Sequence, residues 1–283
     1  MKKVIFLSVL ILLCTGGFVT AFAEELHGSI GVTYDSKYIW RGFDIYGDKS
    51  AIHPFVDLDL FGTGFGINVT AHRANSSGYE NSERWDYTIY YRNRAFEDKV
   101  YAMDYMFAYR YYNYPDNTSH KQANATGTYG SVDLQEVHGL FSWPNILQVE
   151  GLVPRYCLVK LWPSNSGTVV GSRSLPNGVR GTASGWAHIF MLDYALKTSC
   201  PIMEGQERVF NLHSELVYND GVHPGGGRVD HDWSNMVFGI STNFDLGNSL
   251  AFIPGVYHQI TFDDSVNDDK DESWVSLAVM YSF

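Results

Sequence analysis

The chain has 283 residues, of which 45 % are hydrophobic and 15 % aromatic, and it carries 31 acidic against 20 basic residues for a net charge of −11. This acidic balance argues against nucleic acid as a partner, because binding a phosphate backbone requires a basic surface. The length fits one barrel domain better than two globular domains.

The N-terminal segment has the pattern of a cleaved secretory signal. Lys2–Lys3 form a positive region, and the apolar run Val4–Leu13 is too short to span a bilayer. The small-x-small sequence Ala21–Ala23 predicts that residues 1–23 are the signal and that 24–283 form the mature domain. Removing two of the 20 basic residues leaves 18 against 31 acidic ones, a net charge of −13. No apolar run near the length of a transmembrane helix follows the signal.

The mature sequence is predicted to form about twelve β-strands, each roughly 9–13 residues long, which suits a tilted membrane strand. In most of them apolar or aromatic residues alternate with polar ones, and a period of two indicates a strand with one apolar face. The predicted strands lie near Ser29–Arg41, Ala51–Leu60, Phe65–Ala74, Trp85–Arg92, Val100–Tyr112, Val132–Ser142, Gly151–Trp162, Gly185–Leu196, Phe210–Tyr218, Asn235–Asp245, Leu250–Ile260 and Trp274–Phe283.

The first and last strands alternate clearly, whereas the three central strands have mixed parity, and Pro154 weakens one of them. The apolar face predicted for the first strand carries Ile30, Val32, Tyr34, Tyr38 and Trp40. Cys157 and Cys200 also fall in the central region. Export to an oxidising compartment makes a disulfide between them possible, but their number alone does not imply one.

The connections alternate in length along the chain. Those after odd strands are long and polar: Gly42–Ser50, Asn75–Glu83, Asn113–Ser131, Pro163–Ala183, Asn219–Asp232 and Thr261–Asp271. Most of those after even strands are short: Phe61–Gly64, Asn93–Asp98, Trp143–Leu147 and Gly247–Asn248, with Lys197–Gln206 as the exception. Short periplasmic turns and long outer loops are typical of outer-membrane barrels. We therefore expect both chain ends on the periplasmic side and an even number of strands.

Tryptophans gather at predicted strand ends, as expected for an aromatic girdle at a membrane interface. Those expected at outer ends are Trp40, Trp85, Trp162, Trp186, Trp233 and Trp274, and Trp143 falls at a periplasmic turn. Trp274 has the opposite parity to Phe283, which leaves an inward orientation open. Chance clustering at strand ends in any all-β protein is the alternative explanation.

The opposite face of the strands is charged and is predicted to face the lumen. Its residues are Asp35, Lys37, Arg41, Asp57, Asp59, His72, Asp86, Arg92, Asp104, Arg110, His213 and Glu215, with Glu136 and His138 from the segment of mixed parity. A charged interior would cost too much in a dry sandwich but is tolerable in a wet barrel. Barrels near 8 strands are filled by side chains and those of about 16–18 hold channels, so both a narrow pore and a filled barrel stay open.

Two further groups of residues could carry chemistry. The acidic segment Asp263–Glu272 has oxygen ligands suited to Ca²⁺ but lacks the spacing of an EF-hand, so a solvated loop is favoured. His223 and Asp230–Asp232 show no specific metal-ligand spacing, and no metal is expected there. His188 and His258 have outward parity near outer strand ends, where a lipid hydrolase would place a serine and a histidine. No Gly-x-Ser-x-Gly motif is present, and we expect no enzyme activity.

The segment Tyr34–Gly42, in which aromatic residues precede Arg41-Gly42, resembles the first strand of the TorF-like family of small bacterial outer-membrane porins. The terminal segment Ser273–Phe283 is also similar to that family. The resemblance covers mainly the two ends of the chain, and the segment Val132–Gln206 departs from it. The resemblance implies an outer-membrane barrel with a porin or transporter role and no catalytic residues.

We therefore predict an all-β, transmembrane, antiparallel up-and-down barrel of about 12 strands in the bacterial outer membrane. The leading functional hypothesis is passive diffusion of small hydrophilic solutes, without a cofactor. A closed structural or interaction barrel and a lipid hydrolase are the alternatives, and a soluble secreted β-sandwich is the alternative fold. Expected partners are outer-membrane lipid, lipopolysaccharide and the barrel-assembly machinery. Tyr281 and Phe283 are predicted to form the signal read by that machinery.

Overall fold

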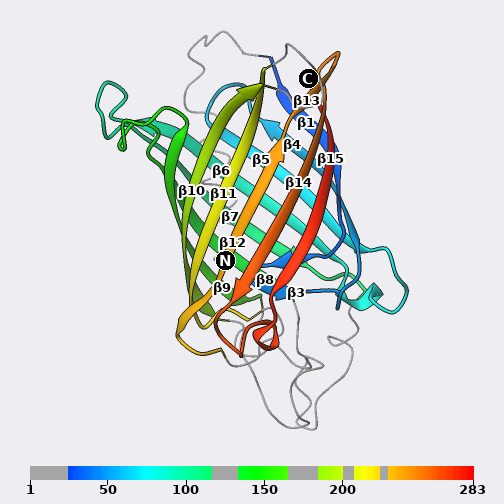
Figure 1. Ribbon diagram of the computed structural model, residues 1–283. Coiled ribbons are helices and arrows are strands. Elements are labelled where there is room, and N and C mark those ends of the chain that lie inside the picture. The colour runs from blue at the N-terminus through cyan, green and yellow to red at the C-terminus, as the bar shows by residue number, and fades with distance from the viewer. Residues whose placement is uncertain (1–24, 117–132, 165–183, 200–206, 224–228) are drawn as a thin grey trace, which may run out of the picture.

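The computed structural model describes residues 25–116, 133–164, 184–199, 207–223 and 229–283. Neighbouring strands of one antiparallel sheet close into a twelve-stranded barrel (Figure 1). Its strands are β1 (His27–Asp35), β4 (Ala51–Asp59), β5 (Phe65–Ala74), β6 (Arg84–Ala95), β7 (Met103–Asn113), β8 (Leu134–Ser142), β9 (Leu152–Pro163), β10 (Gly185–Ser199), β11 (Glu207–Asp220), β12 (Asp232–Thr242), β14 (Leu250–Thr261) and β15 (Glu272–Ser282). Every predicted strand overlaps one of these, so the predicted fold is confirmed.

The sheet closes because the first and last strands pair with each other. Ile30 of β1 lies opposite Val56 of β4 on one side and Tyr281 of β15 on the other. Phe283 and Gly28 exchange backbone hydrogen bonds of 2.9 and 3.0 Å just beyond the ladder. The predicted terminal strand is therefore the closing strand of the barrel, and the ladder leaves no free edge there.

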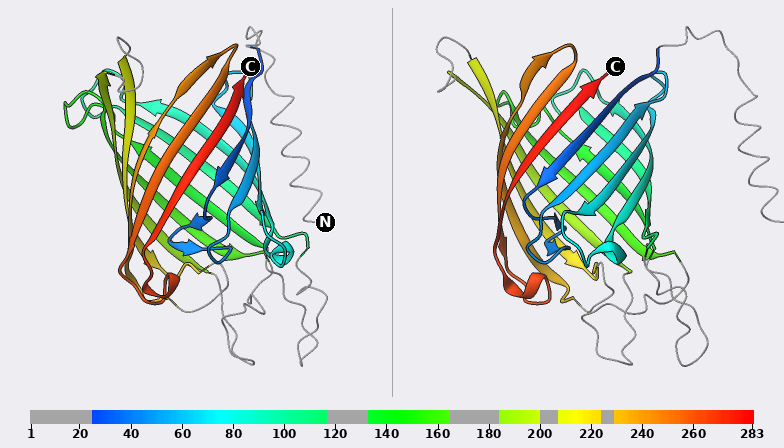
Figure 2. Two further views of the ribbon diagram at one scale, coloured as in Figure 1. Left: turned by 45° about the vertical axis from the view of Figure 1, so that its right-hand side comes forward. Right: turned by 90° about the vertical axis from the view of Figure 1, so that its right-hand side faces the viewer.

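The two ends of the barrel differ (Figure 2). The terminal rim carries the start of β1, the end of β15 and the short connections, among them the hairpin extension β13 (Phe244–Gly247). The loop rim carries the long connections, which include the short helices η1 (Glu80–Ser82) and η3 (Asn267–Asp269). The predicted alternation of loop lengths is thus present in the described chain. No helix in the described part is long and apolar enough to cross a membrane.

The outer surface of the barrel is apolar. Its side chains include Ile30, Val32, Ile89 and Phe107, which are 41–58 % exposed. The tryptophans on the exterior near the loop rim are Trp85, Trp162, Trp186 and Trp233. An exposed apolar belt with interfacial indoles is the surface of a protein whose solvent is lipid.

The predicted girdle is wrong at Trp40, and Trp274 takes the inward orientation that its parity left open. Trp40 is only 9 % exposed and lies inside the barrel. Trp274 lies opposite Tyr257 across the ladder, their rings stack 5.3 Å apart, and both point inward. Alternation identifies an apolar side chain but cannot tell whether its apolar environment is lipid or the protein interior.

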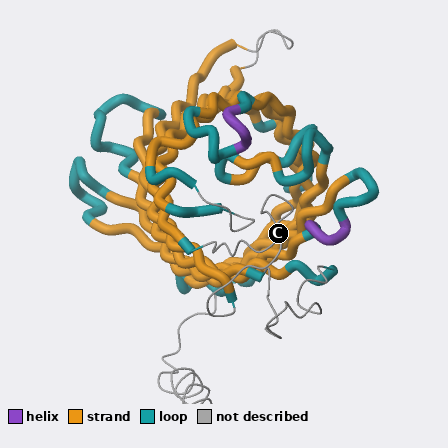
Figure 3. Tube along the Cα trace, turned by 90° about the horizontal axis from the view of Figure 1, so that it is seen from below, coloured by secondary structure: helices purple, strands orange, loops and turns teal. Residues whose placement is uncertain are grey.

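The first strand is also shorter than predicted. Strand β1 ends at Asp35, and the chain then turns into the lumen, where it forms a small hairpin of β2 (Ile39–Trp40) and β3 (Phe43–Asp44). Tyr38, predicted to face lipid, is 6 % exposed inside the barrel. We call the inserted segment, residues 37–48, the plug. Figure 3 views the barrel from the loop rim and shows loop segments lying within the ring of strands.

The mixed parity of the central strands has its cause in the plug. Toward the loop rim, β9, β10 and β11 carry apolar inward-facing residues, all at most 8 % exposed: Val159, Leu161, Ala187, Ile189 and Val217. They pack with Tyr38, Trp40 and Tyr46 in one cluster. Since these strands are apolar toward lipid on one face and toward the plug on the other, alternation disappears.

Candidate functional site: the lumen plug

The plug turns at Arg41-Gly42. Trp40 pairs with Phe43, so Arg41 and Gly42 are the two residues of a hairpin turn, with φ of 51° and 91°. Positive φ at both central positions is the type I′ geometry that suits a tight hairpin and favours glycine. A Cβ on Gly42 would lie 2.7 Å from Oδ1 of Asn235 and 2.8 Å from Cγ1 of Val266. The Arg-Gly pair that resembles the porin family is therefore the tip of the plug.

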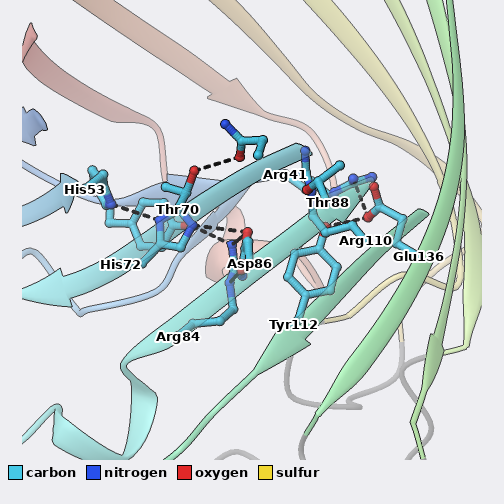
Figure 4. Close-up of polar contacts among 12 residues, drawn as sticks. Arg41, His53, Thr70, His72, Arg84, Asp86, Thr88, Arg110, Tyr112 and Glu136 are labelled. Carbon is cyan, nitrogen blue, oxygen red and sulfur yellow. Dashed lines mark hydrogen bonds and ion pairs between the residues drawn. The ribbon is translucent and has the colours of Figure 1, made fainter. Parts of the chain in front are cut away.

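One side of this tip is held by a buried carboxylate. Glu136 of β8 is fully buried and accepts hydrogen bonds of 2.6 Å from Nη2 of Arg41 and 2.6 Å from the hydroxyl of Tyr112 (Figure 4). His138 approaches its second oxygen at 2.8 Å. A buried ion pair is maintained when its geometry is good and its lone pairs are satisfied. Arg41 and Tyr112 both donate to Oε2 of Glu136, whereas His138 faces Oε1 as an ion-pair partner.

The other side of the tip is held by the opposite wall. The carbonyl of Gly42 accepts a 2.8 Å hydrogen bond from Nε2 of Gln259, a fully buried residue of β14. Strands β8 and β14 are separated around the ring by β9, β10, β11 and β12. Consecutive residues Arg41 and Gly42 thus bond to distant walls, and the plug crosses the lumen.

A third anchor lies where the plug leaves the wall. Nζ of Lys37 is 2.5 Å from Oε2 of Glu272 on β15 and 2.6 Å from Oδ1 of Asp48 at the far end of the plug. Hydrogen bonds to these carboxylates raise the pKa of Lys37 above its ordinary value, and the ammonium lowers the pKa of Asp48. The ends of the plug are therefore held together by charge.

A chain of polar groups supports the plug from β1, β4, β5 and β6. Nδ1 of His72 lies 2.8 Å from Nδ1 of His53, and Nε2 of His72 lies 3.1 Å from Asp86 (Figure 4). Nε2 of His53 lies 3.2 Å from Asp35. Two imidazole nitrogens at this distance need one proton between them, so one ring donates to the other.

Tyr38 of the plug rests on this histidine chain. Its ring stacks on His72 with centroids 4.9 Å apart, and its hydroxyl accepts a 2.7 Å hydrogen bond from Arg84. Arg84 also donates to Asp86 at 2.7 Å and is 2 % exposed. The aromatic part of the plug is therefore held by both stacking and charge-assisted hydrogen bonds.

The lumen at the terminal rim is polar. A cavity of about 510 Å³ opens there between Ser29, Asp57, Asp59, Arg92 and Met280, among others. Arg92 pairs with Asp59 across the strands, yet its side chain stays 55 % exposed. The Arg92 guanidinium is therefore accessible to solvent at this mouth of the barrel.

Opposite charges also pair elsewhere on the inner wall. Arg94 donates to Asp104 at 2.5 Å, and Asp193 accepts from Arg155 at 3.0 Å and contacts His213 at 2.6 Å. Such cross-strand pairs are favourable where charges face each other on one sheet surface. The inner wall is thus lined by ion pairs of both signs.

The sequence-predicted lumen residues divide into two groups. Those around the plug are Asp35, Lys37, Arg41, His72, Asp86 and Arg110. Those elsewhere on the inner wall are Asp57, Asp59, Arg92, Asp104, His213 and Glu215. Sequence reasoning did not single out Arg84, His53, Gln259 or Glu272, although the inward parity of His53 was visible. Glu272 is linked to Lys37 across 235 positions, which no local pattern reveals.

A serine–histidine pair lies on the outer face of the barrel. Nδ1 of His258 lies 2.8 Å from Oγ of Ser273, on lipid-facing positions of β14 and β15 near the loop rim. The other candidate, His188, instead contacts the hydroxyl of Tyr156 at 2.7 Å. Among the described residues no carboxylate hydrogen-bonds to either histidine, so neither forms a complete triad.

Two of the sequence predictions fall on residues outside the described part of the chain. These are the signal, residues 1–23, and the state of Cys200. Cys157, the possible partner of Cys200, packs against the plug cluster.

No protein-family model and no curated protein matches the chain. Among solved structures, the chain is similar to the NanC porin, with 9 % identity, 90 % of this chain and 98 % of that chain covered, and a TM-score of 0.49. It is similar to the COG4313 outer membrane channel from Pseudomonas putida F1, with 11 % identity, coverage of 92 % and 97 %, and a TM-score of 0.49. It is also similar to LpxR from Salmonella typhimurium, with 8 % identity, coverage of 90 % of this chain and 100 % of that chain, and a TM-score of 0.46.

Proposed function

We propose that this protein is an outer-membrane channel for passive diffusion of small hydrophilic solutes, with the plug as its constriction. The terminal rim faces the periplasm and the loop rim faces outward, as the alternation of short turns and long loops favours. The TorF-like resemblance supports the same role.

The observation that carries the proposal is the contrast between the two halves of the lumen. Charged side chains of the terminal half, such as Arg92 and Arg94, stay 55 % and 51 % exposed although they point inward or lie at the rim. Charges kept in water inside a barrel line an aqueous space. The outer half is instead closed by Tyr38, Trp40 and Tyr46.

The plug limits the size of the solutes that can cross the barrel. It is joined to the wall by hydrogen bonds, ion pairs and packing, and its hairpin crosses between β8 and β14. Small displacements of such a segment open a narrow path, whereas large solutes stay excluded. Because the inner wall carries paired charges of both signs, we propose weak selectivity between cations and anions.

Liposome swelling with neutral sugars of graded size tests this function. Proteoliposomes containing the folded wild-type chain are expected to admit a pentose faster than a disaccharide. Lys197→Gln, which changes only the exposed pair with Glu150 at the terminal rim, serves as the matched control and is expected to swell like wild type. Swelling equal to that of protein-free liposomes for every sugar would overturn the proposal in favour of a closed structural barrel.

The pair Ser273–His258 favours a second candidate, a hydrolase of outer-leaflet lipid. Its serine oxygen and histidine nitrogen are within hydrogen-bond distance on the lipid face. Incubation of the purified protein with phospholipid or lipopolysaccharide vesicles, followed by mass spectrometry of released fatty acid, tests it. Release that is lost in both Ser273→Ala and His258→Asn would support this candidate. No release by folded wild-type protein would exclude it for these lipids.

A further inference from the structure

We propose that Asp230, Asp263 and Asp264 form a binding site for a divalent cation of the calcium class, which joins two outer loops over the plug. Asp230 belongs to the connection between β11 and β12. Asp263 and Asp264 follow β14. The sequence favoured a solvated acidic loop here, and the structure supplies two observations that point to a ligand.

The first observation is the spacing of the carboxylates. One oxygen from each of the three residues lies within 4.8 Å of the others. Two oxygens bound to one Ca²⁺, each about 2.3–2.6 Å from the ion, are at most about 4.6–5.2 Å apart, so all three carboxylates can reach one such ion. An all-oxygen ligand set suits hard cations rather than soft ones. The spacing therefore suits calcium.

The second observation is a buried oxygen without a partner. Asp263 is only 7 % exposed, and its Oδ1 accepts hydrogen bonds from the backbone N–H and the hydroxyl of Ser265, at 2.8 and 2.6 Å. Its Oδ2 is buried and has no hydrogen-bond partner. Asp263 lines a cavity of about 210 Å³ with Asp230, Asp264 and Asp269. A buried carboxylate oxygen left unpaired is costly, and a bound cation removes that cost.

No basic side chain neutralises this cluster in the described part of the chain. Lys270, the basic residue of the same loop, pairs with Asp268 at 3.4 Å. The contrast with the second acidic cluster, Asp44, Asp48 and Glu272, is informative, because Lys37 bonds to two of its carboxylates. There the chain supplies its own cation. At Asp230, Asp263 and Asp264 it supplies none.

A cation at this site would act on the plug. Val229 and Val266 pack with Phe43, the residue that follows the plug turn. The backbone N–H of Asp230 also donates a 3.0 Å hydrogen bond to Oγ of Ser265. The two loops therefore already touch each other and the plug, and one ion bound by both would hold them in place.

Terbium luminescence of the full chain in detergent tests this site. Trp233 lines the same cavity, and its indole can transfer excitation to bound Tb³⁺. We expect saturable Tb³⁺ emission that Ca²⁺ displaces with half-effect at about 0.1–1 mM, the range of extracellular calcium sites. Asp263→Asn and Asp230→Asn are expected to weaken binding about tenfold or more, equivalent to about 1.4 kcal/mol.

Asp268→Asn is the matched control, since it removes an exposed carboxylate from the same loop but lies outside the site. It is expected to titrate like wild type. Heat-shifted gel mobility establishes that each variant is folded, and calorimetric titration with Ca²⁺ gives a readout independent of Trp233. Folded Asp263→Asn with wild-type affinity, or wild-type protein that takes up neither ion, would overturn the proposal.

Discussion

Arg41, at the tip of the plug, donates a 2.6 Å hydrogen bond to the fully buried carboxylate of Glu136, a residue 95 positions later in the chain. The next residue, Gly42, is bonded to the far wall through Gln259. The plug is therefore fixed at its tip, and in the proposed channel the energetics of that tip would set how readily the lumen opens.

Glu136→Gln removes the charge that holds Arg41. Leaving one member of a buried pair uncompensated costs about 3–5 kcal/mol, so the plug is expected to leave its closed position far more often. Single-channel recording of folded protein should show more frequent and longer openings. Asp104→Asn breaks an exposed pair worth about 0–1 kcal/mol and should leave the openings unchanged. Equal behaviour of the two variants would contradict the assigned role of Glu136.

Gly42→Ala tests the turn itself. A residue other than glycine at a φ of +91° costs about 1–3 kcal/mol, and the new Cβ would meet Asn235 and Val266 at 2.7 and 2.8 Å. Gly78→Ala is a matched control, because Gly78 has a φ of +93° but no atom within 4 Å of its added Cβ. Open probability should rise in the first variant alone. A similar rise in both variants would show that backbone strain raises the open probability even where the new Cβ contacts nothing.

Acidification is expected to loosen the plug through His223. This ring packs edge-on against Phe43 at 4.8 Å, and burial lowers the pKa of His223 below its ordinary value of 6.5. The packed loop therefore takes up a proton less readily than the released loop. Its stability is complete above pH 6.5 and falls as the pH drops below that value.

Channel recordings at about pH 8 and about pH 5 bracket this titration. Openings should be more frequent at the lower pH. His223→Phe keeps the aromatic contact and should remove most of the difference in opening frequency between the two pH values. His27→Asn, at the terminal rim, is the control that keeps the difference. Unchanged pH dependence in His223→Phe would assign the effect to other groups.

Deletion of Phe283 should lower the amount of assembled barrel without changing each assembled copy. The residue contributes two backbone hydrogen bonds with Gly28 and a ring stacked on Tyr281 at 6.3 Å. It lies far from the plug and is 45 % exposed. Outer-membrane fractionation with a heat-shift gel measures assembly, and Phe65→Ala, another exposed aromatic residue near the terminal rim, serves as control. An altered unitary conductance would contradict a role in assembly alone.

The barrel could be predicted from the sequence because the alternation that produces each strand lies within about ten consecutive residues. In β15, Val275, Leu277, Val279 and Tyr281 share one parity, and this period of two identifies a strand with one apolar face. The charged residues of the inner face follow from the same period. Strand pairing then needs only the order of the chain, since neighbours in sequence are neighbours in the sheet.

The plug could not be predicted in this way. Tyr38 and Trp40 continue the parity of β1, and nothing in the alternation marks the turn after Asp35. Their true environment depends on Leu161, Ile189 and other inward apolar residues more than a hundred positions away. The mixed parity of the central strands was the available signal, because a strand that is apolar on both faces has an apolar partner inside.

The most direct test is the single-channel conductance of a barrel whose plug residues 38–45 are replaced by a short glycine-serine linker. Wild-type protein should conduct in small, infrequent steps. The folded, plug-less barrel, identified by heat-shifted mobility, should conduct continuously in larger steps. Silence of the plug-less barrel, or steps equal to those of wild type, would contradict the account of the plug as the constriction of a channel.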